Sequence, residues 1–301
     1  MKTRVLTFLL ACITTLSFAQ NAPKDYAFKV LANKGANEVK SGGDWQPIKT
    51  GASLKLGDEL KLSDNSYMGL VFESGKPLEL KVPGNYKVSV LADQIKAGGT
   101  SVLSKYTDFI LSSNSAEAKK NRLSATGAVD RGEKAAIQLM LPQNQHSGIF
   151  NNVAIISWVG NKDAGPYIVS IRNMFDDELA QIETPETNFE INLADAKFAK
   201  ENALLIEVKS KADPKQVSKQ HLIKKLAPAE QESVKKSLNE IIGEVSEQTA
   251  LNKFILAGFY EENNLFIDAI SAFEEAIKLA PDVTSYREAY DDFLMRHGIK
   301  K

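Results

Sequence analysis

The sequence predicts a multidomain protein, β then α: two small antiparallel β-sandwich modules followed by a C-terminal helical domain. Three observations support this fold class. Between Trp45 and Tyr86, short apolar runs alternate with Gly, Asp, Asn and Pro, a pattern typical of short strands closed by tight turns. A similar alternation returns over residues 135–226. After Pro228 the apolar residues recur every three or four positions, which is the period of an amphipathic helix.

Length and charge narrow the class of protein. The chain has 301 residues, which suggests two or three domains. Its 37 Lys and Arg residues nearly balance its 38 Asp and Glu residues. A general nucleic-acid-binding protein would carry a basic surplus, so no nucleic-acid partner is expected.

Residues 1–19 have the pattern of a secretory signal peptide. Lys2 and Arg4 precede a largely apolar run, which ends in Ser-Phe-Ala at residues 17–19. We expect cleavage after Ala19 and export to the periplasm or cell envelope. A membrane anchor is an alternative, although a bilayer core needs about 20 apolar residues.

The cysteine content limits the chemistry of the mature chain. Cys12 is the only cysteine and lies inside the predicted signal peptide. A cleaved chain would therefore contain no disulfide, thiolate nucleophile or cysteine-bound metal. Leu9-Leu10-Ala11-Cys12 loosely resembles a lipobox, so a lipoprotein attached through Cys12 is another alternative. No transmembrane segment is expected after signal cleavage.

Residues 20–97 are expected to form the first β-domain. Apolar residues alternate, with turns every 8–12 residues, as in a small antiparallel sandwich or barrel. The expected strands are centred on residues 26–30, 39, 54–56, 60–62, 67–72, 78–80 and 86–90.

The first region resembles the FecR-like domain over about residues 26–92. The resemblance rests on an ordered set of residues: Trp45, Gly51, Leu-Gly-Asp at 56–58, Ser66, Gly75 and a closing Leu-x-Leu. Each glycine falls where a β-turn would need a positive φ. The family is named for a periplasmic regulator of ferric-citrate uptake, so the resemblance implies a β-module and leaves an envelope sensor or regulator as an alternative. The regulator's cytoplasmic helix and transmembrane segment have no counterpart in this sequence.

One helix and a linker are expected next. Apolar residues from Val102 to Ile110 recur at helical spacing, so residues 98–113 are predicted to contain an amphipathic helix that packs on the first sandwich or leads away from it. Residues 114–134 are small and polar, which is typical of a linker.

Residues 135–226 are predicted to form the second sandwich. Strands are expected around residues 137–141, 153–159, 167–171, 189–193, 204–208 and 222–226. This region resembles a fibronectin type III-like sandwich, in which an early tryptophan packs on a Tyr-x-Val strand of the facing sheet. Trp158 and Tyr167-x-Val169 fit that pattern, whereas the tyrosine corner is replaced by Leu204-x-Ile206-x-Val208.

Residues 227–301 are predicted to be helical. Pro228 can open a helix, and residues 250–283 resemble a tetratricopeptide-like repeat. The matching residues are Leu256, Tyr260, Ala269, Phe273, Ala276 and Pro281, whereas Lys253 stands where an aromatic residue is common. One repeat cannot bury its own faces. We therefore expect a compact four-helix cap, and a chain cut before Pro228 is expected to keep both β-modules folded.

No residue pattern predicts catalysis, a cofactor or a metal. His146, His221 and His297 lack metal-ligand spacing. The acidic run at residues 176–178 is expected in a solvated hairpin turn, and the Glu pairs at 261–262 and 274–275 on an exposed helix face. Trp45 is expected in the core, with a sugar-stacking role as the alternative.

The sequence therefore favours an exported, non-enzymatic scaffold that binds envelope proteins through a helical groove and the β-modules. Lys253, Asn263, Asn264 and Asp268 are the residues expected to line the groove, because they sit on polar faces of the paired helices. A peptidoglycan-binding or other glycan-binding module is one alternative. A hydrolase with its site in a cleft between the β-modules is another.

Overall fold

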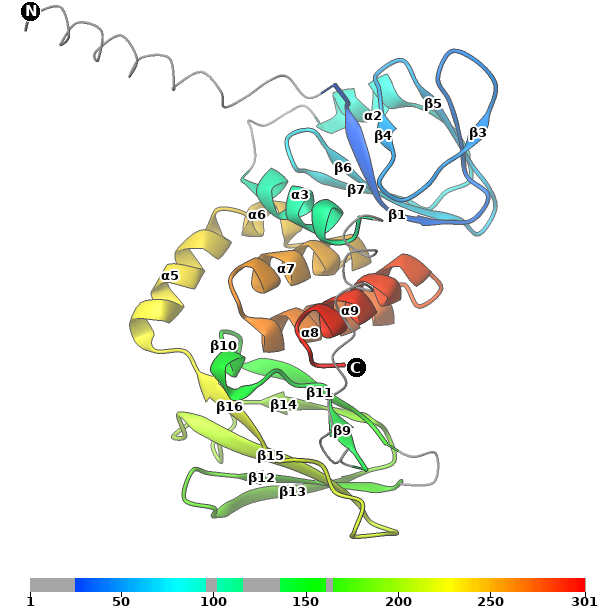
Figure 1. The fold of residues 1–301 in the computed structure, drawn as a ribbon. Helices are drawn as coiled ribbons and strands as arrows, with labels where there is room; N and C mark the ends of the chain where they lie inside the picture. The colour runs from blue at the N-terminus through cyan, green and yellow to red at the C-terminus, as the bar shows by residue number, and fades with distance from the viewer. Residues whose placement is uncertain (1–24, 96–101, 116–135, 161–164, 301) are drawn as a thin grey trace, which may run out of the picture.

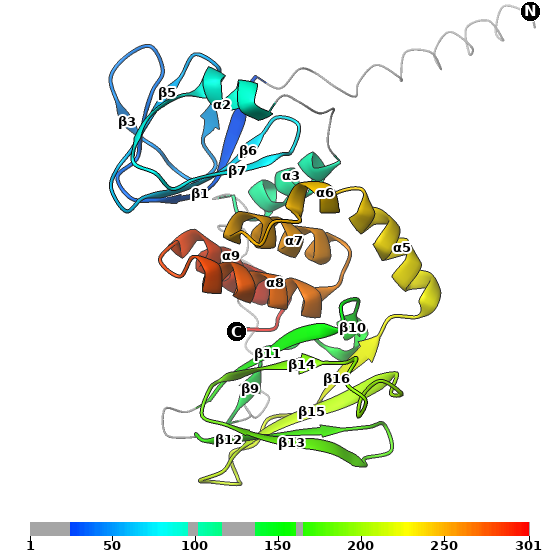
Figure 2. The same cartoon turned by 180° about the vertical axis from the view of Figure 1, so that it is seen from behind.

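The computed structural model describes residues 25–95, 102–115, 136–160 and 165–300 (Figure 1). The predicted signal peptide, Cys12 and nearly all of the predicted linker lie outside these residues. The chain order, β then α, is confirmed. In space the helices lie between the two β-modules, and the same three layers appear from behind (Figure 2).

The first β-module consists of two four-stranded antiparallel sheets, with strand orders β4-β1-β6-β7 and β3-β2-β5-β8. The strands are β1 (Phe28–Lys34), β2 (Glu38–Lys40), β3 (Gln46–Pro47), β4 (Ser53–Leu54), β5 (Glu59–Leu62), β6 (Tyr67–Phe72), β7 (Pro77–Leu80) and β8 (Gly84–Lys87). Alternate apolar residues such as Val30, Leu60 and Met68 form a core of this module. The predicted antiparallel sandwich is therefore present.

The last strand predicted in this module, at residues 86–90, is wrong in its second half: Tyr86 lies in β8, but the strand ends at Lys87. Val88 and Val90 belong to helix α2 (Val88–Ile95). Their alternation suggested a strand, but Val88, Leu91 and Ala92 are buried whereas Val90 is exposed. Burial at spacings of three and four is the helical pattern, and it decides the conformation here.

Strand β6 is buried along its whole length. Met68, Leu70 and Phe72 belong to the core of the first module, whereas Tyr67 and Val71 belong to the core of the helices. A strand that is covered on both faces reads as a continuous apolar run, which explains its sequence. Gly69 lets helix α7 approach, because a Cβ there would lie 3.1 Å from Cδ1 of Leu251.

The second β-module consists of a five-stranded sheet, β10-β16-β15-β12-β13, and a three-stranded sheet, β14-β11-β9. The elements are β9 (Gln138–Leu139), the 3-10 turn η1 (Asn144–His146), β10 (Gly148–Ile149), β11 (Val153–Val159), β12 (Tyr167–Arg172), β13 (Glu178–Thr184), β14 (Asn188–Asn192), β15 (Ala203–Ser210) and β16 (His221–Lys225). Trp158 and Tyr167 from the two sheets meet edge to face at 5.3 Å between ring centroids. This is the tryptophan–tyrosine contact that the resemblance implied.

Two features of this module were not predicted. β10 pairs with β16 in parallel, whereas every pairing was expected to be antiparallel. β13 is the edge strand of the larger sheet and pairs with β12. Its sequence, ELAQIET, is too polar to read as a buried strand, because one of its faces and its outer edge meet solvent.

The helical layer contains α3 (Leu103–Ser113), α5 (Pro228–Asn239), α6 (Ile242–Val245), α7 (Ala250–Glu262), α8 (Phe266–Leu279) and α9 (Thr284–Arg296). The predicted number of four helices is wrong: five follow within residues 228–300, and α3 joins them by packing on α7. The layer also lies between the modules instead of at an outer end (Figure 1). α7 and α9 face the first module, and α8 faces β10 and β11 of the second.

Aromatic residues form the centre of this layer. Phe273 of α8 packs against Phe254 of α7 and against Tyr290 and Phe293 of α9. α7 begins after Thr249, whose hydroxyl accepts a hydrogen bond from the backbone N–H of Asn252. None of the helices within the described residues is long and apolar enough to cross a membrane.

Candidate functional site

The four residues predicted to line a helical groove do not form one surface. Lys253 makes an ion pair with Glu275 across α7 and α8. Asn263 and Asn264 make the turn between these helices, where the Asn263 amide donates to the carbonyl of Phe259 and Asn264 has a φ of 58°. Asp268 lies on the polar side of α8, as expected, but it is only 1% exposed and therefore offers little surface to a partner.

Asp268 attaches the second β-module to α8. Its two carboxylate oxygens accept hydrogen bonds of 2.9 Å from the backbone N–H groups of Phe150 and Asn151. Burial raises the pKa of Asp268 to about 6, although both hydrogen bonds favour the ionised form. A buried carboxylate with two backbone donors has its hydrogen-bonding capacity committed inside the protein.

The polar face of α8 continues this attachment. Asp268, Ser271 and Glu274 follow at intervals of three and therefore lie on one side of the helix. The Ser271 hydroxyl accepts from the backbone N–H of Ile155 at 2.9 Å, and Glu274 accepts from the Ser157 hydroxyl at 2.5 Å. Burial raises the pKa of Glu274. Among the described strands, β9 pairs with β11 at Trp158 and Val159. Along the earlier part of β11, the side chains of α8 accept the hydrogen bonds instead.

A groove of about 290 Å³ remains beside this interface. Lys253 and Asp268 line one side, and residues 151–153 of the second module line the other. The Asn151 amide donates to the hydroxyl of Tyr260 at 2.9 Å, and burial raises the pKa of this tyrosine to about 12. The polar side of the helix pair is therefore largely covered by the protein's own β-module.

A second polar interface holds the first module. The hydroxyls of Tyr67 and Tyr286 lie 2.7 Å apart, and Tyr67 also donates to Glu79 at 2.6 Å. The same Glu79 oxygen accepts from the backbone N–H of Leu251 at 2.8 Å, in the first turn of α7, where a negative charge is favourable. Burial raises the pKa of both tyrosines, which keeps them protonated as donors.

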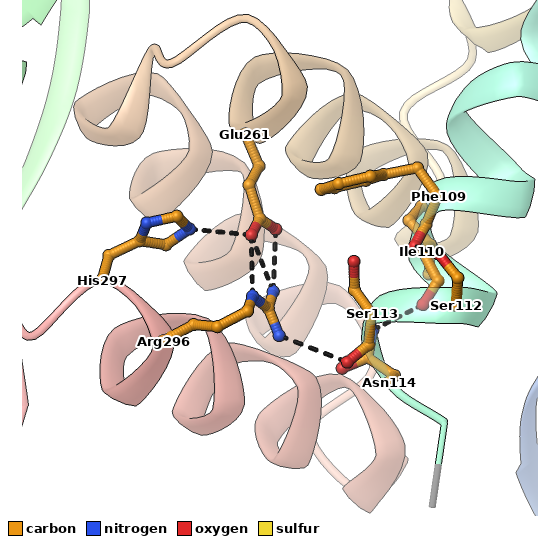
Figure 3. A network of polar contacts seen from close by, with 8 residues as sticks. All are labelled: Phe109, Ile110, Ser112, Ser113, Asn114, Glu261, Arg296 and His297. Carbon is orange, nitrogen blue, oxygen red and sulfur yellow. Dashed lines mark hydrogen bonds and ion pairs between the residues drawn. The ribbon is translucent and has the colours of Figure 1, made fainter. Parts of the chain in front are cut away.

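Figure 3 shows a third network, in which α9 is bound to α7 and α3. Arg296 holds both oxygens of Glu261 at 2.8 and 3.0 Å, and its other terminal nitrogen lies 3.5 Å from the carbonyl of Ser113. His297 Nε2 lies 2.8 Å from the same carboxylate. The His297 ring also packs on Phe266, at 4.0 Å between centroids. The Glu261 carboxylate and the His297 ring therefore hold α9 against α7 and α8, which is a structural role.

The paired glutamates of the helices are also engaged in contacts between elements. Glu261 and Glu274 were expected on an exposed face, and this is wrong because both are drawn into interfaces between elements. Glu262 pairs with Lys105 of α3 at 2.7 Å, and Glu275 pairs with Lys253. The space between the β-modules, where a hydrolase site was considered, is occupied by α7, α8 and α9 (Figures 1 and 2).

The three histidines lie in different parts of the fold. His146 packs on Phe266 at 4.6 Å, on the chain segment that enters β10, and His221 lies on β16 with Nδ1 3.1 Å from the carbonyl of Lys219. Within the described ranges, no three His, Cys, Asp or Glu side chains are grouped so as to hold a metal ion.

Two of the three most exposed large apolar side chains among the described residues lie next to each other at the tip of the β12–β13 hairpin. Phe175 is 85% exposed and Met174 is 56% exposed. Asn173 fixes the backbone of this tip, because its side-chain oxygen accepts from the N–H groups of Phe175 and Asp177. Asp176 adopts a φ of 70° and pairs with Arg172 at 3.1 Å. A rigid turn therefore presents two apolar side chains to solvent.

Sequence reasoning missed this surface. Asp176, Asp177 and Glu178 were expected in a solvated hairpin turn, and they do lie at the turn and the start of β13. The neighbouring Met-Phe pair gave no warning because an apolar dipeptide is ordinarily part of a core. Two apolar residues between an Asn and three acids, with no alternation around them, were the available signal.

No protein-family model matches this chain, and a search of curated proteins also returns no match. The three resemblances seen in the sequence therefore remain proposals.

Proposed function

We propose that this protein is an exported, non-enzymatic scaffold of the bacterial cell envelope, which binds partner proteins through its two β-modules. The pattern of residues 1–19 supports export. The observation that carries the proposal is the central position of the helices. Buried polar contacts attach α8 to the second module and α7 and α9 to the first. The helices thus act as a rigid spacer, which fixes the distance between two outward-facing β-surfaces.

This proposal moves binding away from the helical groove. Asp268, Ser271 and Glu274 are committed to the protein's own strands. Phe175, in the turn between β12 and β13 of the second module, is not covered by any of the described helices and is 85% exposed. Partner binding is therefore assigned to the β-modules.

Cross-linking in intact cells tests the scaffold function. Cells that secrete the tagged chain are treated with a membrane-permeable cross-linker, and bound proteins are identified by quantitative mass spectrometry. A small exported protein of unrelated fold serves as the control. We expect a defined set of envelope proteins enriched with the chain and reproduced with purified components. Retention of the chain in the cytosol, or the absence of any partner that binds the purified chain, would contradict the proposal.

One observation favours a second candidate, a glycan-binding module. Trp45 was expected in the core, and this is wrong: it is only partly buried and lies outside the core of the first module. Lys61 lies above its ring, with Nζ 5.9 Å from the ring centroid. An accessible indole face can stack on a sugar. Sedimentation with purified peptidoglycan tests this, and Trp45→Ala should lower the bound fraction whereas Val82→Ala, at another exposed apolar residue of the same module, should not.

A further inference from the structure

We infer that the β13 edge of the second module binds an extended, basic segment of a partner protein by strand addition, with Met174 and Phe175 as its apolar anchor. This inference rests on the proposed scaffold function and names the class of partner. Three independent features of the described structure converge on this surface: an open strand edge, a rigid apolar tip and an excess of negative charge.

The first feature is the strand edge. β13 has seven residues and lies at the end of the five-stranded sheet, where β12 is its only partner among the strands that the structure describes. The other edge strands of the described sheets have only two to five residues. At about 3.3 Å per residue, β13 offers about 23 Å of edge. Proteins usually protect such edges with charged side chains (Lys above all), Pro, β-bulges or a very short strand. β13 contains neither Lys nor Pro, its one register shift against β12 lies at its start, and its charged residues are Glu178 and Glu183, which repel an acidic strand and admit a basic one.

The second feature is the anchor beside that edge. Phe175 and Met174 project from the turn that leads directly into β13. The Asn173 side chain accepts from two backbone N–H groups of the turn and donates to Asp177 at 3.0 Å. Because the turn is already ordered, a partner that covers Phe175 loses little conformational entropy in the process. Exposed aromatic anchors of this kind contribute strongly to protein interfaces.

The third feature is charge. Residues 172–186 contain five acids (Asp176, Asp177, Glu178, Glu183 and Glu186) and one base (Arg172), so their formal charge is 1 − 5 = −4, whereas the whole chain carries −1. Arg172 pairs with Asp176, and Lys211 of the neighbouring region pairs with Glu183. The remaining acids favour a partner segment rich in Lys and Arg. They oppose an anionic membrane surface as the occupant, because like charges repel.

Peptide display tests the inference and requires no candidate partner. A random dodecapeptide library on phage is selected on the purified full chain, after depletion on the Phe175→Ser variant. We expect the retained peptides to alternate Lys or Arg with β-branched or aromatic residues. A synthetic copy should bind less tightly as the salt concentration rises. Hydrogen exchange should show new protection at the amides of β13 and not at those of the helices.

Matched variants separate the contributions. Phe175→Ser should weaken binding of the selected peptide at least 10-fold, whereas Val82→Ser on the first module should leave it unchanged. Glu178→Lys with Glu186→Lys should weaken binding by a similar factor, and Glu73→Lys with Glu190→Lys should not. All four positions of the charge variants are exposed, so the fold should be retained in each case.

Three outcomes would overturn the inference: no enrichment of any peptide, enriched peptides without basic residues, or protection away from β13. In each of these, a partner found by cross-linking in cells would leave the scaffold function standing. Peptide binding at β13 without any envelope partner in cells would instead contradict the scaffold function alone.

Discussion

Single polar side chains decide how the layers of this protein join. Asp268, Ser271 and Glu274 occupy the side of α8 that a surface helix would turn to water, and each accepts a hydrogen bond from the second module. A buried acceptor of this kind costs free energy unless a donor is supplied. The backbone N–H groups of Phe150, Asn151 and Ile155 supply that donor to Asp268 and Ser271, so these residues make the docking of the two layers specific.

The raised pKa of Asp268 predicts a pH-dependent stability. Its folded-state pKa of about 6 lies above the ordinary value of 3.8, so this group contributes stability at low pH that is lost as the pH rises through about 6. Relative to Asp268→Asn, the free energy of unfolding of the unmodified protein should fall by about 2–3 kcal/mol between pH 4 and pH 7. Urea unfolding at both pH values measures this difference. Asp64→Asn, the same change at an exposed turn, should show no such trend, and parallel pH profiles for Asp268→Asn and the unmodified protein would contradict the prediction.

Phe273 should be among the most costly residues to truncate. It is 2% exposed and contacts three other aromatic rings from α7 and α9. Phe273→Ala is expected to lower the free energy of unfolding by about 3–5 kcal/mol through lost burial and a cavity. Phe175→Ala, at an exposed position, should change it by no more than about 0.5 kcal/mol. Equal effects of the two substitutions in thermal unfolding would show that Phe273 is not packed as described.

At the scale of elements, two strands are covered on both faces. β6 contributes to the core of the first module and to that of the helices. β11 directs Ile156 and Trp158 into the second module, while Ile155 and Ser157 meet α8. Helices that cover these strands also pack closely on the turns between them. Gly75, in the β6–β7 turn, lies against the first turn of α3.

Gly75→Ala should loosen the packing of α3 on the first module. Gly75 has a φ of +99°, and an added Cβ would lie 2.4 Å from the backbone nitrogen of Ser104. Gly51 is the matched control, because its φ is +87° and nothing lies within 4 Å of its added Cβ. Both substitutions incur similar backbone strain. Gly75→Ala should therefore cost about 1–3 kcal/mol more in urea unfolding, the usual range for overpacking; equal losses would exclude a tight α3 contact.

At the scale of the whole molecule, each β-module depends on the helices for cover. Leu31, Ala32 and Val71 of the first module belong to the helical core, and Ile267 of α8 belongs to the core of the second. The expectation that a chain cut before Pro228 keeps both modules folded is therefore replaced by a different one.

A chain that ends at Ala227 should expose the helix-facing sides of β6 and β11. We expect it to bind a hydrophobic dye, because it would expose large apolar patches. It should also unfold with lower cooperativity than the full chain, because parts of the shared cores are lost. The full chain under identical conditions is the control. Cooperative unfolding at the original denaturant midpoint, without dye binding, would show that the modules are independent of the helices.

The sequence alone determined the order of β and α regions, most strand positions and the helix pair between residues 250 and 279, because local periodicity and turn residues act over a few positions. Only the tertiary structure decided that the helices lie between the modules, since this depends on contacts between residues about 100 to 220 positions apart, such as Phe150 with Asp268 and Tyr67 with Tyr286. It also decided the fate of Asp268 and Phe175. Asp268 was expected on a polar face and is buried, and no feature of the sequence marked Phe175 as exposed, because burial is a property of the assembled neighbours and not of the side chain itself.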